Sequence, residues 1–497
     1  MTGFRRRATV VAGAAVLGAV AAGGVMAWRR RPTVGSGPVS GRRLVERNLR
    51  LARMAARGGG RYAVHRARRT FASAERRDAL DTEFQLRTAA DVTAELGNMK
   101  GAMMKIGQMA SYLDTGLPDT VRQTMASLQH DAPPMAPELA ARQVIDELGA
   151  HPDRLFLEWD PVPIASASIG QVHRAITAGG RAVAVKVQYP GVADAVAADL
   201  GNAGWIFGGL AAMFPSVDPE PIVAEISDRL VEELDYGIEA ANQRMFHHYF
   251  AGHPFISVPG VVDDLSTTQV LTTDLATGAR FSDVIGWSQA ERNLAAETLF
   301  RFSFGAIYRL HAFNGDPHPG NYLFNPGGQV TFLDFGLVKR FTEAETQLFA
   351  DMIRTMVVER DAAAFRRIVT DAGILAPDAP FSDAEVEDYF SYYYRYVLED
   401  RPITIDTEYA AAGFGHLFDT NGPYQDLMRF LNVPPSFVVV QRITLGLMGL
   451  FAQLEATANW RRIAAELWPF TSSPPSTPMG REILAWRERS GGVVGGV

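Results

Sequence analysis

The sequence DPHPGNYLFNPGGQVTFLDFG, residues 316–336, places two short polar motifs on either side of an apolar run. Asp316 and Asn321 flank a histidine that stands between two prolines, and Asp334 follows the apolar run. Proline fixes the backbone φ angle at about −65°, so the first motif predicts a stiff loop in which His318 makes a structural hydrogen bond. The segment 329–338 predicts a strand that ends on Asp334.

Two upstream features complete a pattern typical of phosphoryl transfer. A loop of small residues at 164–170 separates two predicted strands, and Lys186 lies on the strand that follows them, in VAVK. Small residues let backbone N–H groups approach phosphates, and a strand lysine pairs with them. Asn321 follows Asp316 at five residues, the spacing of a kinase catalytic loop, and Asp334 follows at 18. Together they predict a nucleotide and divalent-metal site.

The composition is that of a globular protein with ample material for a core. The chain has 497 residues, of which 47% are hydrophobic and 21% charged. This length allows two to four domains. Because the chain contains no cysteine, disulfides, thiolate catalysis and cysteine-ligated zinc are excluded.

The N-terminal region predicts a membrane-associated segment. Residues 1–80 contain 18 Arg, no Lys and three acidic residues, which gives +15, while the rest of the chain carries −22. Residues 8–28 are 21 uncharged residues between two triple-arginine clusters, a length that suits one transmembrane span. An export signal and a segment lying on the membrane surface are the alternatives. The basic block after it favours anionic lipid over nucleic acid as the partner.

The rest of the chain alternates predicted helices and strands. Strands are expected near 155–166, 169–176, 182–188 and 270–278, and helices at 82–130, 192–213, 219–250 and 288–313. Beyond 338 the pattern is mostly helical to about residue 470, followed by a loose tail. The apolar stretch 437–454 is short and contains Arg442, so it predicts a buried core helix and not a second span.

Five motifs give the chain a specific resemblance. KIGQ at 105–108, IASASIGQVH at 164–173 and ELDYGIEAAN at 233–242 join DPHPGN and LDFG. This set resembles the UbiB-like, ADCK-type family of atypical kinases over residues 85–460. The alanine-rich loop of the family here reads Ala-Ser-Ala-Ser, and Asp274 stands where the family often has glutamate. Neither departure removes a required group.

The resemblance implies an α+β, bilobal protein-kinase-like fold with a β-rich N-lobe, a helical C-lobe and an N-terminal helical extension. We expect the following division: a membrane anchor or signal-like segment at 1–31, a basic linker at 32–81, the KxGQ extension at 82–135, the N-lobe at 136–278, the C-lobe at 279–470 and a flexible tail at 471–497.

The resemblance also implies a role for each matching residue, with ATP and Mg²⁺ as cofactors. Asp316 would be the catalytic acid, Lys186 would pair with the phosphates and with Glu239, and Asn321 and Asp334 would bind Mg²⁺. The residues that would contact the nucleotide are Ala165, Ser166, Ala167, Ser168, Gly170, Asp274 and Leu275. The KxGQ helix would reach over the cleft, with Lys105 directed toward Glu233 and Asp235 and Gln108 one turn away on the same face of the helix.

The activity implied is that of an Mg-dependent ATPase or atypical kinase. After LDFG the chain enters a helical pattern almost directly, without a long activation loop or an A-P-E motif. The family is associated with isoprenoid-quinone biosynthesis and lipid homeostasis, which implies anionic or isoprenoid lipids and biosynthetic proteins as partners. The expected dependence on ATP favours a cytoplasmic catalytic domain. A pseudokinase scaffold and a small-molecule phosphotransferase are the alternatives.

Overall fold

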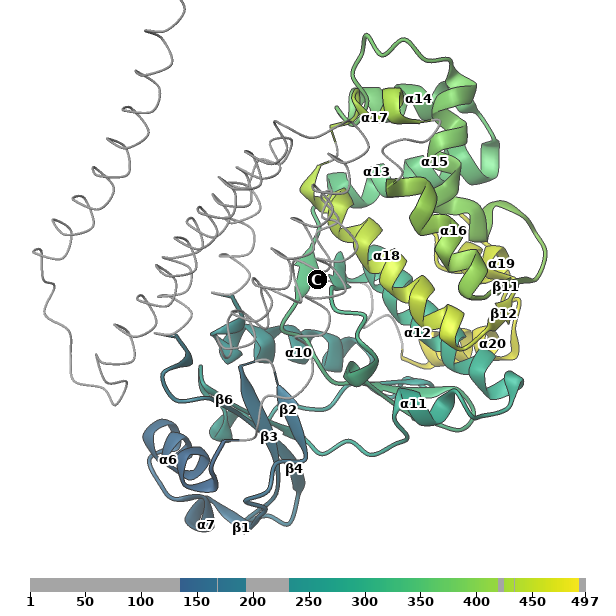
Figure 1. The fold of residues 1–497 in the computed structure, drawn as a ribbon. Helices are drawn as coiled ribbons and strands as arrows, with labels where there is room; N and C mark the ends of the chain where they lie inside the picture. The colour runs from purple at the N-terminus through teal and green to yellow at the C-terminus, as the bar shows by residue number, and fades with distance from the viewer. Residues whose placement is uncertain (1–134, 168, 194–231, 419–423, 433, 491–497) are drawn as a thin grey trace, which may run out of the picture. The chain divides into compact units, whose positions relative to one another are not determined.

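The computed structural model describes residues 135–490, apart from 168, 194–231, 419–423 and 433. The segment 8–28, the basic region, the KxGQ motif, nearly all of the helix predicted at 192–213 and the first part of the helix predicted at 219–250 lie outside these residues. The remainder of the second helix is present as α10, Tyr236–Tyr249. Within the described residues, no helix is both long and apolar enough to cross a membrane. The chain folds as a mixture of sheets and helices, as predicted (Figure 1).

A five-stranded antiparallel sheet forms the N-lobe, with the order β1-β3-β4-β6 and β2 paired to β3. The strands lie close to their predicted positions. Their bounds are β1 Phe156–Trp159, β2 Ala165–Ala167, β3 Gly170–Thr177, β4 Ala182–Gln188 and β6 Val270–Asp274. Two helices precede the sheet, α6 Pro137–Leu148 and α7 Pro152–Leu155.

The alternation of residues along β4 separates the two faces of the sheet. Val183, Val185 and Val187 are fully buried in one core cluster with Ala140 and Val144 of α6. Successive side chains of a strand point to opposite faces. The face opposite α6 therefore carries Lys186, and on that side lies helix α10, which spans Tyr236–Tyr249.

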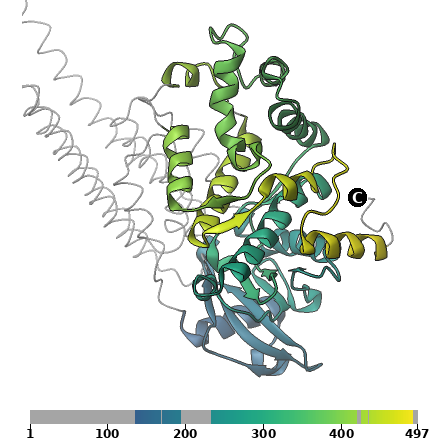
Figure 2. The same cartoon turned by 90° about the vertical axis from the view of Figure 1, so that its right-hand side faces the viewer.

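The C-lobe is mainly helical and encloses the largest core cluster (Figure 2). Its helices are α11 Phe281–Val284, α12 Gln289–Arg309, α13 Glu343–Ile353, a π-helical segment Arg354–Glu359, α14 Ala362–Asp371, α15 Asp383–Leu398, α16 Thr407–Phe418, α17 Gln425–Met428, α18 Pro435–Gln453, α19 Trp460–Ala465 and α20 Pro478–Arg489. Most residues of α12 after its first turns are buried, so α12 is the central helix of the lobe. The core helix predicted at 437–454 is confirmed as α18.

Short strands position the two polar motifs of 316–336. β8 Tyr322–Asn325 and β9 Gln329–Phe332 form a hairpin, and β5 Ile256–Ser257 pairs with β9 in parallel. β7 Ala312–Asn314 pairs with β10 Val338–Arg340, so the segments before the first motif and after the second lie side by side. β11 Ile403–Ile405 pairs with β12 Ala456–Ala458, away from these motifs.

Two details differ from the sequence predictions. The strand expected at 329–338 ends at Phe332, because the backbone turns at Asp334 and a separate strand begins at Val338. The prediction of a flexible tail from residue 471 onward is wrong for Pro478–Arg489, which form helix α20. Thr477 caps this helix by accepting from the Gly480 N–H, and Met479, Ile483 and Trp486 are buried. The spacing of those three residues is helical, but proline- and serine-rich flanks obscured it.

Candidate active site

Lys186 and Glu239 form a buried ion pair between the sheet and α10. The Lys186 amine donates to both carboxylate oxygens of Glu239, at 2.9 and 2.8 Å. Asp235 caps the start of α10 by accepting from the Gly237 N–H at 2.8 Å, which places Glu239 in the first turn of the helix. The Lys186 amine also lies over the ring of Tyr236, 4.9 Å from its centre.

The charges around this pair keep Lys186 protonated. Burial by itself lowers the pKa of the Lys186 amine, but the carboxylates of Glu239 and Asp334 outweigh burial and raise that pKa above its ordinary value. Burial and the nearby Asp334 raise the pKa of Glu239, while Lys186 acts in the opposite direction. The lysine therefore holds a fixed positive charge in a low-dielectric site, where it interacts strongly with an anion.

Asp334 is a second carboxylate close to Lys186. Its Oδ2 is 3.9 Å from the lysine amine, and its Oδ1 accepts from the Gly336 N–H at 2.9 Å. The next residue, Phe335, is fully buried, and its ring packs on Phe246 of α10 with 5.0 Å between ring centres. Asn242 of α10 donates to the Phe335 carbonyl at 3.2 Å. The LDFG segment is thus held against the helix that supplies Glu239.

The first motif forms the stiff loop that its prolines predict. The Asn321 amide donates to the Asp316 carbonyl at 3.1 Å and to its carboxylate at 3.0 Å. His318 makes the predicted structural hydrogen bond, since its Nδ1 accepts from the Gly320 N–H at 3.1 Å. Residues Pro319–Asn321 form a short 3₁₀ turn that leads into β8. The loop therefore fixes the Asp316 carboxylate relative to Asn321.

The β8–β9 hairpin brings the two motifs together. Tyr322 pairs with Phe332, and the Leu333 N–H donates to the Asn321 carbonyl at 3.0 Å. Asn321 and Asp334 consequently stand at the same end of the hairpin. Asn314, just before the first motif, donates to the Asp334 carbonyl at 2.8 Å and so joins β7 to the second motif.

The small-residue loop lies between β2 and β3, with Ala165, Ser166 and Ala167 on β2. Gly170 begins β3 where no other residue fits, because an added Cβ would lie 2.3 Å from the Val187 carbonyl oxygen and 3.0 Å from the Tyr236 hydroxyl. Ser168 lies outside the described residues. The tight packing at Gly170 fixes the end of the loop next to β4 and α10.

The remaining predicted residues have structural partners. Asp274, at the end of β6, forms an ion pair with Arg181 and accepts from the Gly260 N–H at 3.1 Å; the Arg181 hydrogen bond is the main reason that its pKa is lowered. The Leu275 N–H donates to the Ala182 carbonyl at 3.1 Å. Glu233 is half-buried just before α10. Lys105 and Gln108 lie outside the described residues, so the pairing of Lys105 with Glu233 and Asp235 remains a prediction.

Sequence reasoning missed several residues that shape this site. Tyr236, Asn314 and Arg181 each contact a predicted residue, and Asn242 contacts Phe335, the neighbour of Asp334. Asn242 follows Glu239 by three residues on the same helix, and neighbours at this spacing share a face, so its place beside Glu239 could be predicted but its contact with Phe335 could not. Arg181 and Asp274 are 93 residues apart in the sequence, and no local pattern indicates their ion pair.

The donor atoms present suit a magnesium–nucleotide complex. The described part of the chain contains no group of three or more His, Asp or Glu side chains that could hold a metal ion by itself. Asn321 and Asp334 offer hard oxygen ligands, and Mg²⁺ in nucleotide sites is bound by one or two such groups together with phosphate oxygens and water. Asn321 and Asp334 would hold the metal, and the fixed charge of Lys186 suits the phosphates.

Comparison with known proteins identifies relatives of this chain. Residues 127–369 match the model of the ABC1 atypical kinase-like domain. The chain is 33% identical to the mitochondrial atypical kinase COQ8B of Rattus norvegicus over 54% of this chain and 51% of the relative. It is 29% identical to the probable protein kinase UbiB of Marinobacter nauticus over 71% of this chain and 64% of the relative. It thus spans about half to two thirds of their lengths.

A solved structure has the same fold. It is the Mycobacterium tuberculosis protein Rv3197 in complex with erythromycin, which is 28% identical in sequence and superimposes with a TM-score of 0.58. The match covers 80% of this chain and all of the other. The arrangement of lobes described above is therefore one that a relative also adopts.

Proposed function

Because the chain belongs to the UbiB-like family of ABC1-type atypical kinases, we propose that it binds MgATP and cleaves the γ-phosphate, with water or a hydroxyl group as acceptor. The observation that carries this proposal is the position of the Lys186 amine, which contacts Glu239 and lies 3.9 Å from Asp334. Phosphoryl transfer in kinases depends on such a lysine, paired with a helix glutamate and close to the metal-binding aspartate.

The roles of the side chains follow from their contacts. MgATP, when bound, supplies the phosphoryl group and the charge of the metal. Lys186 would pair with the α- and β-phosphates, and Asn321 and Asp334 would hold Mg²⁺. Asp316, whose carboxylate is oriented by the Asn321 amide at 3.0 Å, would accept the proton of the attacking oxygen.

The short connection after the second motif supports hydrolysis over phosphorylation of protein substrates. Only β10 and a short turn lie between Gly336 and the start of α13 at Glu343. A protein kinase has a longer activation loop there, followed by an A-P-E motif. Without that segment the chain lacks the usual platform for a peptide acceptor.

We further propose that the protein acts at a membrane, in isoprenoid-lipid (quinone) biosynthesis or lipid homeostasis. Its relatedness to UbiB and COQ8B supports the pathway. The uncharged segment 8–28 and the 18 arginines of residues 1–80 support an anionic lipid surface as partner. ATP dependence favours a cytoplasmic catalytic domain.

The Asp334→Asn variant tests the enzymatic part of the proposal. We expect phosphate release from MgATP to fall more than about 100-fold, because a lost metal ligand removes several kcal/mol of charge stabilisation. The exposed residue Asp264 provides the control, and Asp264→Asn should release phosphate at the wild-type rate. Thermal unfolding followed by circular dichroism would establish that both variants are folded. Unchanged hydrolysis in folded Asp334→Asn protein contradicts the metal assignment.

The same phosphate-release assay tests the alternative of a pseudokinase scaffold and the proposed lipid partner. Wild-type protein that binds ATP but releases no phosphate would favour the scaffold. Phosphate release would be measured with vesicles of neutral phosphatidylcholine and with vesicles that contain anionic phosphatidylglycerol. We expect the anionic vesicles to sediment the full-length protein and to change its rate, and equal behaviour with both would count against the lipid partner.

A further inference from the structure

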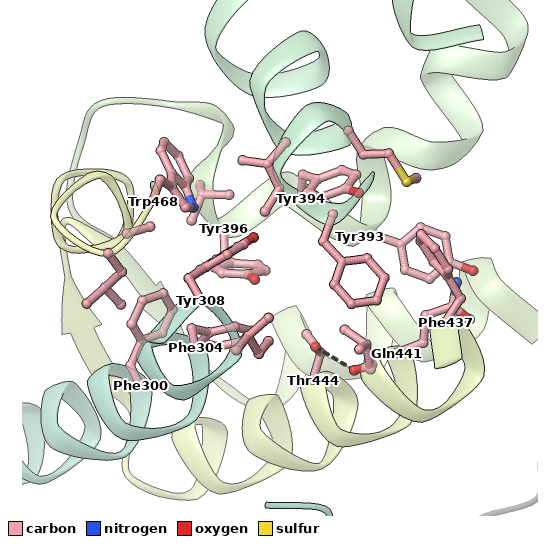
Figure 3. A pocket seen from close by; sticks show the side chains of 18 of the residues that line it. Phe300, Phe304, Tyr308, Tyr393, Tyr394, Tyr396, Phe437, Gln441, Thr444 and Trp468 are labelled. Atoms are coloured by element: carbon pink, nitrogen blue, oxygen red, sulfur yellow. Dashed lines mark hydrogen bonds between the residues drawn. The ribbon is translucent and has the colours of Figure 1, made fainter. Parts of the chain in front are cut away.

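The C-lobe contains an aromatic cavity separate from the candidate active site. It lies between α12, α13, α15, α18 and the end of α19, and holds about 880 Å³ of space not occupied by atoms, part of it open to solvent. Figure 3 shows the labelled side chains gathered around this space. None of the described residues that line the cavity carries a charge. A charged ligand would therefore lose its hydration without compensation, whereas a neutral one would not.

Three tyrosines contribute their side chains to the wall of this cavity. Tyr308 of α12 and Tyr394 and Tyr396 of α15 line it, and each interacts electrostatically with at least one of the others. Burial raises the pKa of all three phenols, so they stay neutral hydrogen-bond donors. No described residue provides any of the three hydroxyls with a hydrogen-bond partner.

The three tyrosine hydroxyls differ from the hydroxyl of Thr444, which has a hydrogen-bond partner within the protein. The hydroxyl of Thr444, which also lines the cavity, donates to the Val440 carbonyl of its own helix at 2.8 Å (Figure 3). Buried hydroxyls ordinarily find a partner, since an unsatisfied one costs about 1–3 kcal/mol. All three tyrosines line the cavity and keep part of their surface accessible. Their donors are thus available to a molecule inside it.

We propose that this cavity binds a neutral small molecule that contains apolar rings and an acceptor oxygen, such as a carbonyl or an ether. The aromatic walls, which include Phe300, Phe304, Phe437 and Trp468, would pack against the rings. The tyrosine hydroxyls would donate to the oxygen. The proposal concerns a second site and does not rest on ATP turnover.

Benzophenone is a suitable probe, because it has two phenyl rings and one carbonyl, and near-ultraviolet light couples it to nearby C–H bonds. Purified full-length protein would be irradiated with increasing concentrations, and the labelled peptides identified by mass spectrometry. We expect saturable labelling of peptides from α12, α15 and α18. Labelling that does not saturate, or that maps to other segments, overturns the proposal.

Diphenylmethane, which lacks the carbonyl, separates the contribution of the rings from that of the hydroxyls. It should compete with benzophenone, but more weakly. Replacing Tyr308, Tyr394 and Tyr396 together with phenylalanine keeps the rings and removes the donors. We expect this variant to bind benzophenone about tenfold more weakly and diphenylmethane equally well, since one net hydrogen bond contributes about 1 kcal/mol or more.

Controls keep the outcome interpretable. If the triple variant does not fold, Tyr396→Phe alone should weaken benzophenone binding in the same direction by a smaller factor. Tyr249→Phe removes a tyrosine hydroxyl outside the cavity and should leave both affinities unchanged. Equal benzophenone affinity in wild type and a folded tyrosine variant contradicts the role of the hydroxyls. Because labelling needs no ATP, failure here and failure of the proposed hydrolysis are distinguishable.

Discussion

Single side chains fix the candidate site through polar contacts between segments far apart in the sequence. Asn314 and Asn242 each donate to a backbone carbonyl of LDFG, at 2.8 Å to Asp334 and 3.2 Å to Phe335. Removing either amide leaves a buried or half-buried carbonyl without its donor, which costs about 1–3 kcal/mol. The geometry of the second motif thus depends on two asparagines that were not among the predicted catalytic residues.

His253 is a residue whose neutral form the fold requires. Its Nδ1 accepts from the N–H groups of Phe255 and Ile256, at 3.1 and 2.9 Å. Burial lowers the pKa of this imidazole to about 3, and the charges of Arg487 and Arg301 act in the same direction. Protonation in the folded state would abolish both hydrogen bonds.

This depressed pKa predicts a loss of stability in acid. The unfolded chain takes up a proton near pH 6.5 and the folded chain only near pH 3, so stability is full above pH 6.5 and falls as the pH drops between these values. We expect the free energy of unfolding in urea to fall by up to about 1.4 kcal/mol per pH unit from pH 6 to 4 because of this group.

His253→Asn should remove this part of the pH dependence, whereas His248→Asn, at an exposed position of α10, should retain it. Parallel pH profiles for wild type and His253→Asn would contradict the assignment.

At the scale of elements, helix α18 packs directly on the catalytic loop. A Cβ at Gly446 would lie 2.4 Å from the Pro317 ring, next to Asp316. Gly449, one turn further along the same helix, has no atom within 4 Å of such a Cβ. Substitutions at Gly446 and Gly449 therefore separate the effect of helix propensity from the effect of the contact with the loop.

We expect Gly446→Ala to displace Pro317 and to lower the rate of phosphate release, although alanine favours the helix. Gly449→Ala should keep the wild-type rate and stabilise the fold by up to about 1 kcal/mol, because glycine is a poor helix former. Steady-state kinetics and urea unfolding would measure both effects. Equal rates for the two variants would show that the loop tolerates the displacement.

Helix α20 is fastened to the C-lobe by a buried polar network and by one large side chain. Arg301 of α12 donates to Glu297 and Glu466 at 2.8 Å each, and it also contacts Thr477, which caps α20. The Trp486 ring is buried, and its Nε1 donates to the Ala251 carbonyl at 3.2 Å. The helix therefore contributes to the stability of the lobe.

Trp486→Ala should destabilise the protein by about 3–5 kcal/mol, the usual effect of removing a buried tryptophan. Leu484 lies on the same helix and is 41% exposed, so Leu484→Ala should change the free energy of unfolding by less than about 0.5 kcal/mol. Denaturant unfolding of the two variants beside wild type measures the difference. Similar small effects would mean that α20 docks only loosely.

At the scale of the whole molecule, local sequence patterns predicted the features that depend only on residues close together in the sequence. The valine alternation of β4 and the prolines around His318 specified a strand and a loop without knowledge of the fold. Long-range partners were not accessible in this way. The Arg181–Asp274 ion pair, the Asn242 contact with Phe335 and the docking of α20 depend on which surfaces meet after folding. The family resemblance predicted the candidate site, because the motifs of the family mark residues that come together only after folding.

The burial of Phe335 against α10 bears on how such a protein is controlled. Many kinases are inactive until a signal moves the glutamate helix or the DFG segment into place. Here both already stand together, joined by the Asn242 hydrogen bond and by the Phe246–Phe335 contact. An effector would not need to bring these two elements together. Regulation would instead act on the access of the nucleotide to Lys186 and Asp334.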